Sequence, residues 1–343
     1  MEGVLAGKRR AALMGIGLSA ALLITLVVSV SLGDMRIPPL RVARIILTRI
    51  LNDSRALASF PRNELAVVLE IRLPRVLSGL FVGAGLAAAG AIFQSLLGNP
   101  LADPYTLGVS TGAALGATVV IFFNVTYGTN LSPVPAALMM AVAALGVVIL
   151  MAGRGGGLIA SNLIIAGMIV SAILSSAISF LKMLAGENVS AIVYWMMGSL
   201  SGGAWSDIAL LTPAVLLGVA VAWPFAGDLN ALTLGDRAAA ALGVDVRRTR
   251  LVMLLAGSLI TAVCVSVSGI IGFVGLIVPH ALRLAASSDN RRLLPLSCLA
   301  GGLLLMLADD AARLIGNGDI PVGVLTTLLG GPFFIYLFLR RGR

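Results

Sequence analysis

Long apolar segments separated by short polar ones make up most of this chain. The first runs from residue 11 to residue 32, and nine more follow, beginning near residues 72, 108, 134, 161, 208, 251, 268, 293 and 321. Several exceed the roughly 20 residues that a helix needs to cross a bilayer. Because a backbone in lipid must satisfy its own hydrogen bonds, we expect ten transmembrane helices. The predicted fold class is an all-α polytopic membrane protein, with residues 1–343 in one transmembrane domain.

Composition supports a membrane protein and excludes several other classes. The chain is 59% hydrophobic and only 11% charged, which is not the composition of a soluble globular protein. Its net charge of +9 comes from arginines that cluster at span ends with few aromatic residues among them, so we expect no nucleic acid partner. Cys264 and Cys298 both lie in apolar segments and predict neither a disulfide framework nor a metal site.

The distribution of positive charge predicts which loops face the cytoplasm. More than half of the 24 lysines and arginines fall at one predicted face, which places both termini in the cytoplasm by the positive-inside rule. Residues 33–70 are an exception, because they are predicted to be periplasmic yet carry six arginines. Leu40, Ala43, Ile46 and Ile50 recur there at helical spacing, which predicts an amphipathic helix on the outer surface.

Residues 228–250 form a polar, basic loop between two apolar segments. Asp236 stands where a carboxylate complements a helix dipole, and Gly243 stands where a helix ends. From these residues alone we favour an ordinary solvated loop. The alternative is that residues 228–247 form a short helical lever on the cytoplasmic face that a soluble partner pushes.

Three candidate sites carry other chemistry. Ser110 lies in a G-x-S-x-G match and, with the single histidine His280, indicates an intramembrane hydrolase, but a nucleophile elbow needs a strand before its turn. Asp309 and Asp310 indicate either a proton relay in a secondary transporter or ion pairs with Arg313, and we favour the ion pairs. Gln94 is polar and deep in a span, so it faces another helix or lines a cavity.

A nucleotide-binding loop is absent from the sequence. No G-x-x-x-x-G-K-[ST] segment occurs in the chain. We therefore expect no enzyme activity and no bound cofactor or metal. If ATP drives this protein, ATP and Mg²⁺ bind to a partner subunit.

Seven motifs resemble a family. They are RLPR (72–75), AGAIFQSLLGNPLADPYTLGVSTGAA (89–114), LIIAG (163–167), YWMMGSL (194–200), LGDRAAAALGV (234–244), SGIIGFVGLIVPHALR (268–283) and DIPVGVLTTLLGGPFF (319–334). In this order they resemble the iron-siderophore, haem and cobalamin permeases, which are type II ABC importer permeases. The glycine-rich turn at 153–157 and the Gly-Gly before Pro332 depart from the usual pattern.

The resemblance implies an assembly and a cargo. We expect a homodimer in the cytoplasmic membrane of a bacterium or archaeon, two ABC ATPase subunits on its cytoplasmic side, and a periplasmic or lipid-anchored binding protein. The expected cargo is a ferric siderophore, with haem and cobalamin or another corrinoid as alternatives.

The resemblance also implies roles for individual residues. Docking of the binding protein falls on Arg72, Arg75 and Arg313. Coupling to the ATPase falls on Leu234, Gly235, Asp236, Ala239, Ala241, Leu242 and Gly243. The cytoplasmic gate falls on Asn99, Pro100, Leu101, Ala102, Ala160 and Ser161. Pathway or packing roles fall on Gln94, Gly330, Pro332 and Phe333.

Overall fold

The structure is a computed structural model that describes residues 2–154, 158–315 and 320–341. Those residues form helices and turns and contain no strand. The all-α class predicted from the hydropathy pattern is therefore confirmed. Residues 155–157 of the predicted glycine-rich turn, Asp319 of the last motif and the terminal Arg343 lie outside the described ranges.

Eight helical segments of the described chain are long and apolar enough to cross a membrane. They contain the helices α1 (Glu2–Ser31), α5 (Leu73–Leu96), α6 (Val109–Tyr127), α7 (Pro133–Arg154), α8 (Ala160–Ala185), α10 (Trp205–Ala222), α13 (Val246–Ser268) and α15 (Asn290–Ile315). Two more apolar helices, α14 (Val274–Ala285) and α16 (Val322–Arg341), have shorter described apolar segments. The expected count of ten spans is not confirmed by length and composition alone.

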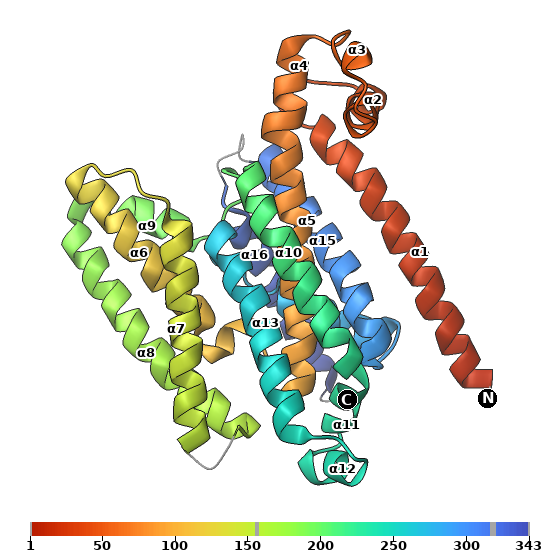
Figure 1. The fold of residues 1–343 in the computed structure, drawn as a ribbon, viewed down its shortest axis with the longest axis vertical. Helices are drawn as coiled ribbons and strands as arrows, with labels where there is room; N and C mark the ends of the chain where they lie inside the picture. Colours follow the sequence, from red (N-terminus) through yellow and green to blue (C-terminus); the bar gives the residue numbers. More distant parts are fainter. Residues whose placement is uncertain (1, 155–157, 316–319, 342–343) are drawn as a thin grey trace.

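Shorter helices connect these spans. They are α2 (Pro39–Ile50), α3 (Ser54–Leu57), α4 (Arg62–Ala66), the π-helix η1 (Val67–Arg72), the 3-10 helices η2 (Pro104–Leu107), η3 (Gly186–Asn188) and η4 (Trp223–Phe225), α9 (Val189–Met196), α11 (Ala226–Leu232) and α12 (Asp236–Ala241). We call the end of the bundle that carries α2–α4 the α2 end, and the end that carries α11 and α12 the α12 end. Figure 1 shows these two groups at opposite ends.

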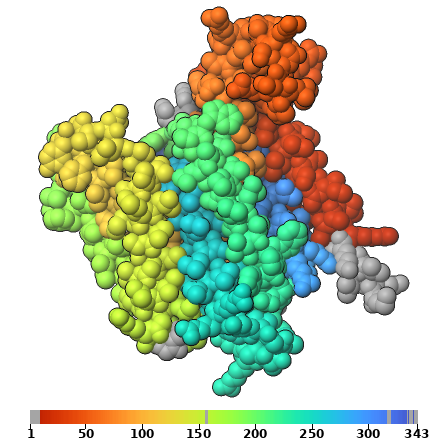
Figure 2. Space-filling view, viewed as in Figure 1, coloured from red at the N-terminus to blue at the C-terminus, as the bar shows by residue number. Residues whose placement is uncertain are grey.

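The arrangement is a bundle around α5. This helix is buried along most of its length and packs against α15, α13, α14 and α10, while α6, α7 and α8 form a neighbouring group (Figure 1). Helix α1 lies along one flank and is mostly exposed within the chain. In the space-filling view, residues near 50 protrude above the bundle and residues near 235 below it (Figure 2).

Glycines allow the central helices to approach closely. A Cβ atom built on Gly83 of α5 would lie 2.2 Å from the carbonyl oxygen of Gly301 in α15. A Cβ atom on Gly90 would lie 1.8 Å from the carbonyl oxygen of Gly275 in α14. Small residues therefore set the spacing of α5 from two neighbours, as expected for helices that associate inside lipid.

The predicted span at 268–283 is wrong as a single helix. Helix α13 ends at Ser268, and α14 begins only at Val274. Gly269 and Phe273 both have positive φ, at +70° and +68°, so the backbone leaves the helical conformation between them. An apolar, glycine-rich segment gives no sign of this break in a hydropathy pattern.

The predicted outer loop is more helical than expected. α4, η1 and α5 run without interruption from Arg62 to Leu96, so the span predicted to open at Arg72 begins ten residues earlier. The predicted amphipathic helix corresponds to α2. Val42 and Ile45 are buried, whereas Leu40 and Ile50 are exposed.

Candidate functional site

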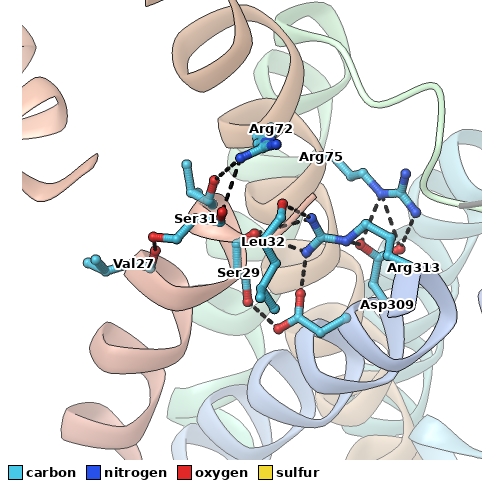
Figure 3. A network of polar contacts seen from close by, with 10 residues as sticks. Val27, Ser29, Ser31, Leu32, Arg72, Arg75, Asp309 and Arg313 are labelled. Carbon is cyan, nitrogen blue, oxygen red and sulfur yellow. Dashed lines mark hydrogen bonds and ion pairs between the residues drawn. The ribbon is translucent and has the colours of Figure 1, made fainter. Parts of the chain in front are cut away.

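The first candidate site is a cluster of arginines and aspartates at the α2 end (Figure 3). Arg75 of α5 donates from Nε and Nη2 to the two carboxylate oxygens of Asp309 in α15, at 2.9 and 2.8 Å. Arg313, one turn along α15, pairs with Asp309 at 3.3 Å and also with Asp310. The predicted pairing of Arg313 with the two aspartates is confirmed. Both carboxylates are neutralised by arginine, which argues against the proton-relay alternative.

The remaining arginine of this cluster is buried. Arg72 is only 7% exposed, and its guanidinium donates to the carbonyl oxygens of Val30 and Ser31 at 3.1 and 3.2 Å (Figure 3). It also donates to the carbonyl oxygen of Met35 at 2.7 Å. These carbonyls belong to the last turn of α1 and the residues after it, which have no partner within the helix. Arg72 therefore caps the C-terminus of α1.

Arg313 caps the same helix from α15. Its guanidinium donates to the carbonyl oxygens of Ser29 and Leu32 at 3.1 and 3.2 Å, and the Ser29 hydroxyl donates to Asp310. Arginines near a helix C-terminus also complement the helix dipole. The cluster thus holds the end of α1 against α5 and α15.

The three predicted docking residues do meet in space. Arg72, Arg75 and Arg313 line one hollow of about 330 Å³, together with Asp34. The sequence pattern did not indicate that all three guanidinium groups also bind partners within the chain.

The second candidate site is the predicted coupling segment at the α12 end. Helix α12 begins at Asp236 and is followed by Gly243, as predicted, and both Gly235 and Gly243 have positive φ. Leu234 and Leu242 flank the helix and are 68% and 67% exposed. Ala239 is buried and Ala241 is exposed. The segment thus anchors one side on the bundle and leaves two leucines largely exposed.

Arg250, at the start of α13, bonds to the coupling helix. Its Nη1 and Nη2 donate to the carboxylate of Asp236 at 3.0 and 2.7 Å, and Nη1 also donates to the carbonyl oxygen of Leu158 at 2.9 Å. Leu158 lies two residues before α8 begins at Ala160. From the sequence, Arg250 is only one of the basic residues of the 228–250 loop, and nothing in the pattern predicts this contact.

A buried polar network ties α11 to α5. Asn230 of α11 accepts from the backbone and side-chain amides of Asn290 at 2.9 and 2.8 Å. The side-chain Oδ1 of Asn290 accepts from the Ser95 hydroxyl of α5 at 2.8 Å, and Arg283 of α14 donates to the same hydroxyl at 2.9 Å. Asn290 and Ser95 are both buried. The sequence signal that could have revealed this network is the occurrence of single polar residues in apolar segments.

The predicted gate turn follows α5 at the same end. The Asn99 side chain accepts from the backbone amide of Leu101 at 2.9 Å and holds the turn, which includes Pro100. Leu101 is half exposed, whereas Ala102 is buried. After Asp103 the chain continues as η2, whose residues Pro104 and Leu107 are buried in the bundle.

Asp103 is an ionisable group next to this turn. Its side chain accepts from the backbone amide of Tyr105 at 3.1 Å. Burial raises the pKa of this carboxyl to about 6, and the hydrogen bond from Tyr105 offsets only part of that effect. Burial also raises the pKa of the Tyr105 phenol, whose hydroxyl donates to the carbonyl of Ile271.

The other predicted gate segment starts α8. Ala160 is the first helical residue, and the Ser161 side chain is exposed. η2 packs on α8 further along, where a Cβ atom on Gly167 would lie 2.4 Å from the carbonyl oxygen of Thr106. The chain that follows the Asn99–Ala102 turn therefore contacts α8 directly.

The predicted pathway or packing residues lie in two places. Gln94 is buried and donates to the carbonyl oxygen of Leu276 in α14 at 3.1 Å, so it faces a helix partner. A Cβ atom on Gly330 of α16 would lie 2.2 Å from the ring of Phe273, which accounts for glycine at that position. Pro332 is exposed and Phe333 is half-buried in the same helix.

The hydrolase and metal-site possibilities have no structural support. Ser110 is buried in α6, and its hydroxyl has no hydrogen-bond partner among the described residues. The element before α6 is the 3-10 helix η2, whereas a nucleophile elbow needs a strand there. Within the described ranges, no three His, Cys, Asp or Glu residues lie close enough to hold a metal ion.

Comparisons with known proteins agree with this architecture. The sequence profile of the FecCD transport family matches residues 21–340 of this chain. The cobalamin import permease of Halobacterium salinarum is 42% identical, covering 82% of this chain and 75% of that one. The hemin transport permease of Yersinia pestis is 40% identical, covering 80% and 83%. The ferric dicitrate permease of Escherichia coli is 39% identical, covering 81% and 84%.

A solved structure shares the fold. It is that of a metal-chelate type ABC transporter in an inward-facing conformation, with a TM-score of 0.81 and 32% identity. The match covers 95% of this chain and 98% of the other. The chain therefore belongs to the FecCD transport family, whose members are the membrane permease subunits of ABC importers and leave ATP hydrolysis to a separate subunit.

Proposed function

We propose that this chain forms a homodimeric permease in the cytoplasmic membrane and imports a metal chelate, with a ferric siderophore as its cargo. The observation that carries the proposal is the coupling segment. Leu234 and Leu242 are exposed beside a short helix at one end of the bundle, in a chain that has no nucleotide-binding loop. Exposed leucines on both sides of a short helix suit a groove on a soluble partner.

The partner at the α12 end is an ABC ATPase, one for each permease chain. ATP binding draws the two ATPases together and displaces α12 in both protomers. The permease dimer then changes which side of the membrane its pathway opens to. In this scheme Asn99–Ala102 and Ala160–Ser161 close the pathway on the cytoplasmic side.

The partner at the α2 end is a substrate-binding protein with acidic side chains. Arg72, Arg75 and Arg313 line a hollow there, and carboxylates of the binding protein approach it. Their contacts compete with Asp309 and with the α1 carbonyls that these arginines already bind. Docking therefore acts on the junction of α1, α5 and α15, and long-range attraction speeds the encounter.

The homodimer contact includes the exposed face of α8. Ser176 and Ser179 lie on this face, and each hydroxyl donates back to a carbonyl of the helix at 3.0 Å. Met168 and Met183 are exposed on the same helix. A face that mixes hydroxyls and flexible thioethers suits a partner helix or a wide pathway with weak contacts better than it suits lipid.

Iron chelates and corrinoids are the two cargo classes in competition. The hemin and ferric dicitrate relatives support an iron chelate, whereas the Halobacterium relative supports a corrinoid. The deciding experiment uses vesicles that contain the permease, its ATPase and its binding protein. Ferric siderophore, ferric citrate, haemin and cyanocobalamin are offered separately. ATP-dependent uptake of a ferric chelate supports the proposal, and uptake of cyanocobalamin alone overturns the iron assignment.

A further inference from the structure

The side chain of Arg250 joins three segments that are separate in the sequence. It lies at the start of α13, it pairs with Asp236 at the first residue of α12, and it bonds to the carbonyl of Leu158 just before α8. The Arg250 side chain is 6% exposed, whereas that of Asp236 is 45% exposed. A buried guanidinium thus connects a half-exposed carboxylate on the coupling helix to the entrance of α8.

The contact is geometrically rigid. Nη1 and Nη2 reach both oxygens of Asp236, and Nη1 still has a hydrogen for Leu158. A planar guanidinium holds such a two-bond pair in one orientation, and water does not compete effectively at a buried group. A displacement of Asp236 therefore moves the guanidinium, and the guanidinium moves the Leu158 carbonyl with it.

The same segment is also bound to α13 at its other end. The Thr249 hydroxyl donates to the carboxylate of Asp228 in α11 at 3.1 Å. α11 and α12 are therefore attached to the first turn of α13 through Asp228 and Asp236. The Arg250 contact continues from there to Leu158, two residues before α8 begins.

We propose that Arg250 is the positioning residue that transmits displacement of α12 to the start of α8, where Ala160 and Ser161 form the gate. This inference rests on the proposed ATP-driven function and adds the connection that the function needs. A competing explanation is that the ion pair only keeps α12 folded. The two differ in whether α12 still moves when Arg250 is removed.

The experiment measures the two segments separately. Spin labels are placed at Ala240→Cys in α12 or at Ile165→Cys in α8, both exposed positions, in a background with Cys264→Ala and Cys298→Ala. Each homodimer then carries one pair of labels. Pulsed electron paramagnetic resonance gives the distance across the dimer, in the full complex with ATPase, without nucleotide and with Mg-ATP plus vanadate.

In the native chain we expect nucleotide to change both distances. In Arg250→Ala the change at residue 240 is expected to remain and the change at residue 165 to be lost. Arg250→Lys keeps a charge near Asp236 but not the two-bond geometry, so part of the change at residue 165 returns. The matched control is Arg154→Ala, which removes an exposed arginine at the same end and leaves both changes intact.

The inference is overturned if residue 165 responds fully in Arg250→Ala. It is also overturned if the changes at residues 240 and 165 are lost together in Arg250→Ala and in Asp236→Asn while the ATPase still binds. A native complex in which neither distance responds to nucleotide contradicts the proposed ATP-driven function itself, and the inference with it.

Discussion

Arg75 and Asp309 form a two-bond ion pair between α5 and α15, with N–O distances of 2.9 and 2.8 Å. Their side chains are 15% and 4% exposed. At that burial, each charge depends on the other, because removing one partner leaves the second charge without compensation. The pair therefore holds the α2 end of the central helix in place, in addition to any role in docking.

The first prediction concerns this pair. Asp309→Ala should lower the free energy of unfolding by about 3–5 kcal/mol, because it leaves Arg75 buried without its carboxylate. The control is Glu64→Ala, which breaks an ion pair but leaves behind Arg41, whose side chain is 47% exposed, and it should cost only about 0–1 kcal/mol. Denaturation of the purified permease in detergent measures both. Equal losses in the two variants would contradict the assigned role of the buried pair.

The second prediction concerns helix packing. A Cβ atom on Gly90 would lie 1.8 Å from the backbone oxygen of Gly275, so Gly90→Ala must push α5 and α14 apart. We expect a loss of about 1–3 kcal/mol or more from overpacking. Gly146→Ala in α7 is the control, since no atom lies within 4 Å of its added Cβ. A Gly90→Ala chain with an unchanged melting temperature would show that the two helices are not held at this spacing.

The third prediction concerns pH. Burial raises the pKa of Asp103 to about 6 in the folded chain, from an ordinary value of 3.8. The folded chain therefore holds this proton more tightly than the unfolded chain, and stability falls as pH rises between these two values. Asp103→Asn keeps an acceptor for the Tyr105 amide but cannot ionise. Its melting temperature should exceed that of the native chain above pH 6 and approach it near pH 4. A difference that does not change with pH would refute the assignment.

The fourth prediction concerns coupling. Leu234 and Leu242 are both about two-thirds exposed, at 68% and 67%. Replacing both by alanine should leave the fold intact, weaken ATPase binding, and reduce the cargo moved per ATP hydrolysed. Leu216→Ala in α10, at a position that is 59% exposed, should change neither quantity. An unchanged ratio of uptake to hydrolysis in the double variant would remove these leucines from the coupling surface.

The hydropathy pattern and the residues that end helices predicted much of the architecture. The apolar segments gave the spans that became α6, α7, α8 and α13, because each is a continuous run closed by glycine, proline or arginine. Asp236 and Gly243 correctly delimited the coupling helix, since capping is a local property that neighbouring residues determine. Local rules therefore succeeded wherever the structure depends on local interactions.

The failures have long-range causes. Arg72 was expected to dock the binding protein, but its bonds to the carbonyls of Val30, Ser31 and Met35, about 40 residues earlier in the chain, were not predicted. The bond from Arg250 to Leu158 was not predicted, because the two residues are 92 positions apart in the chain. No periodicity or spacing reports such contacts. The positive φ of Phe273, whose ring lies against Gly330 of a later helix, was equally hidden.

The most direct test of the account is uptake into proteoliposomes that hold the purified permease with and without its ATPase. ATP is enclosed in the vesicles, the loaded binding protein is added outside, and a pH gradient is applied in a separate arm. The account predicts cargo accumulation only when both ATPase and ATP are present, with no response to the pH gradient. Accumulation driven by the pH gradient in vesicles that lack the ATPase would contradict it.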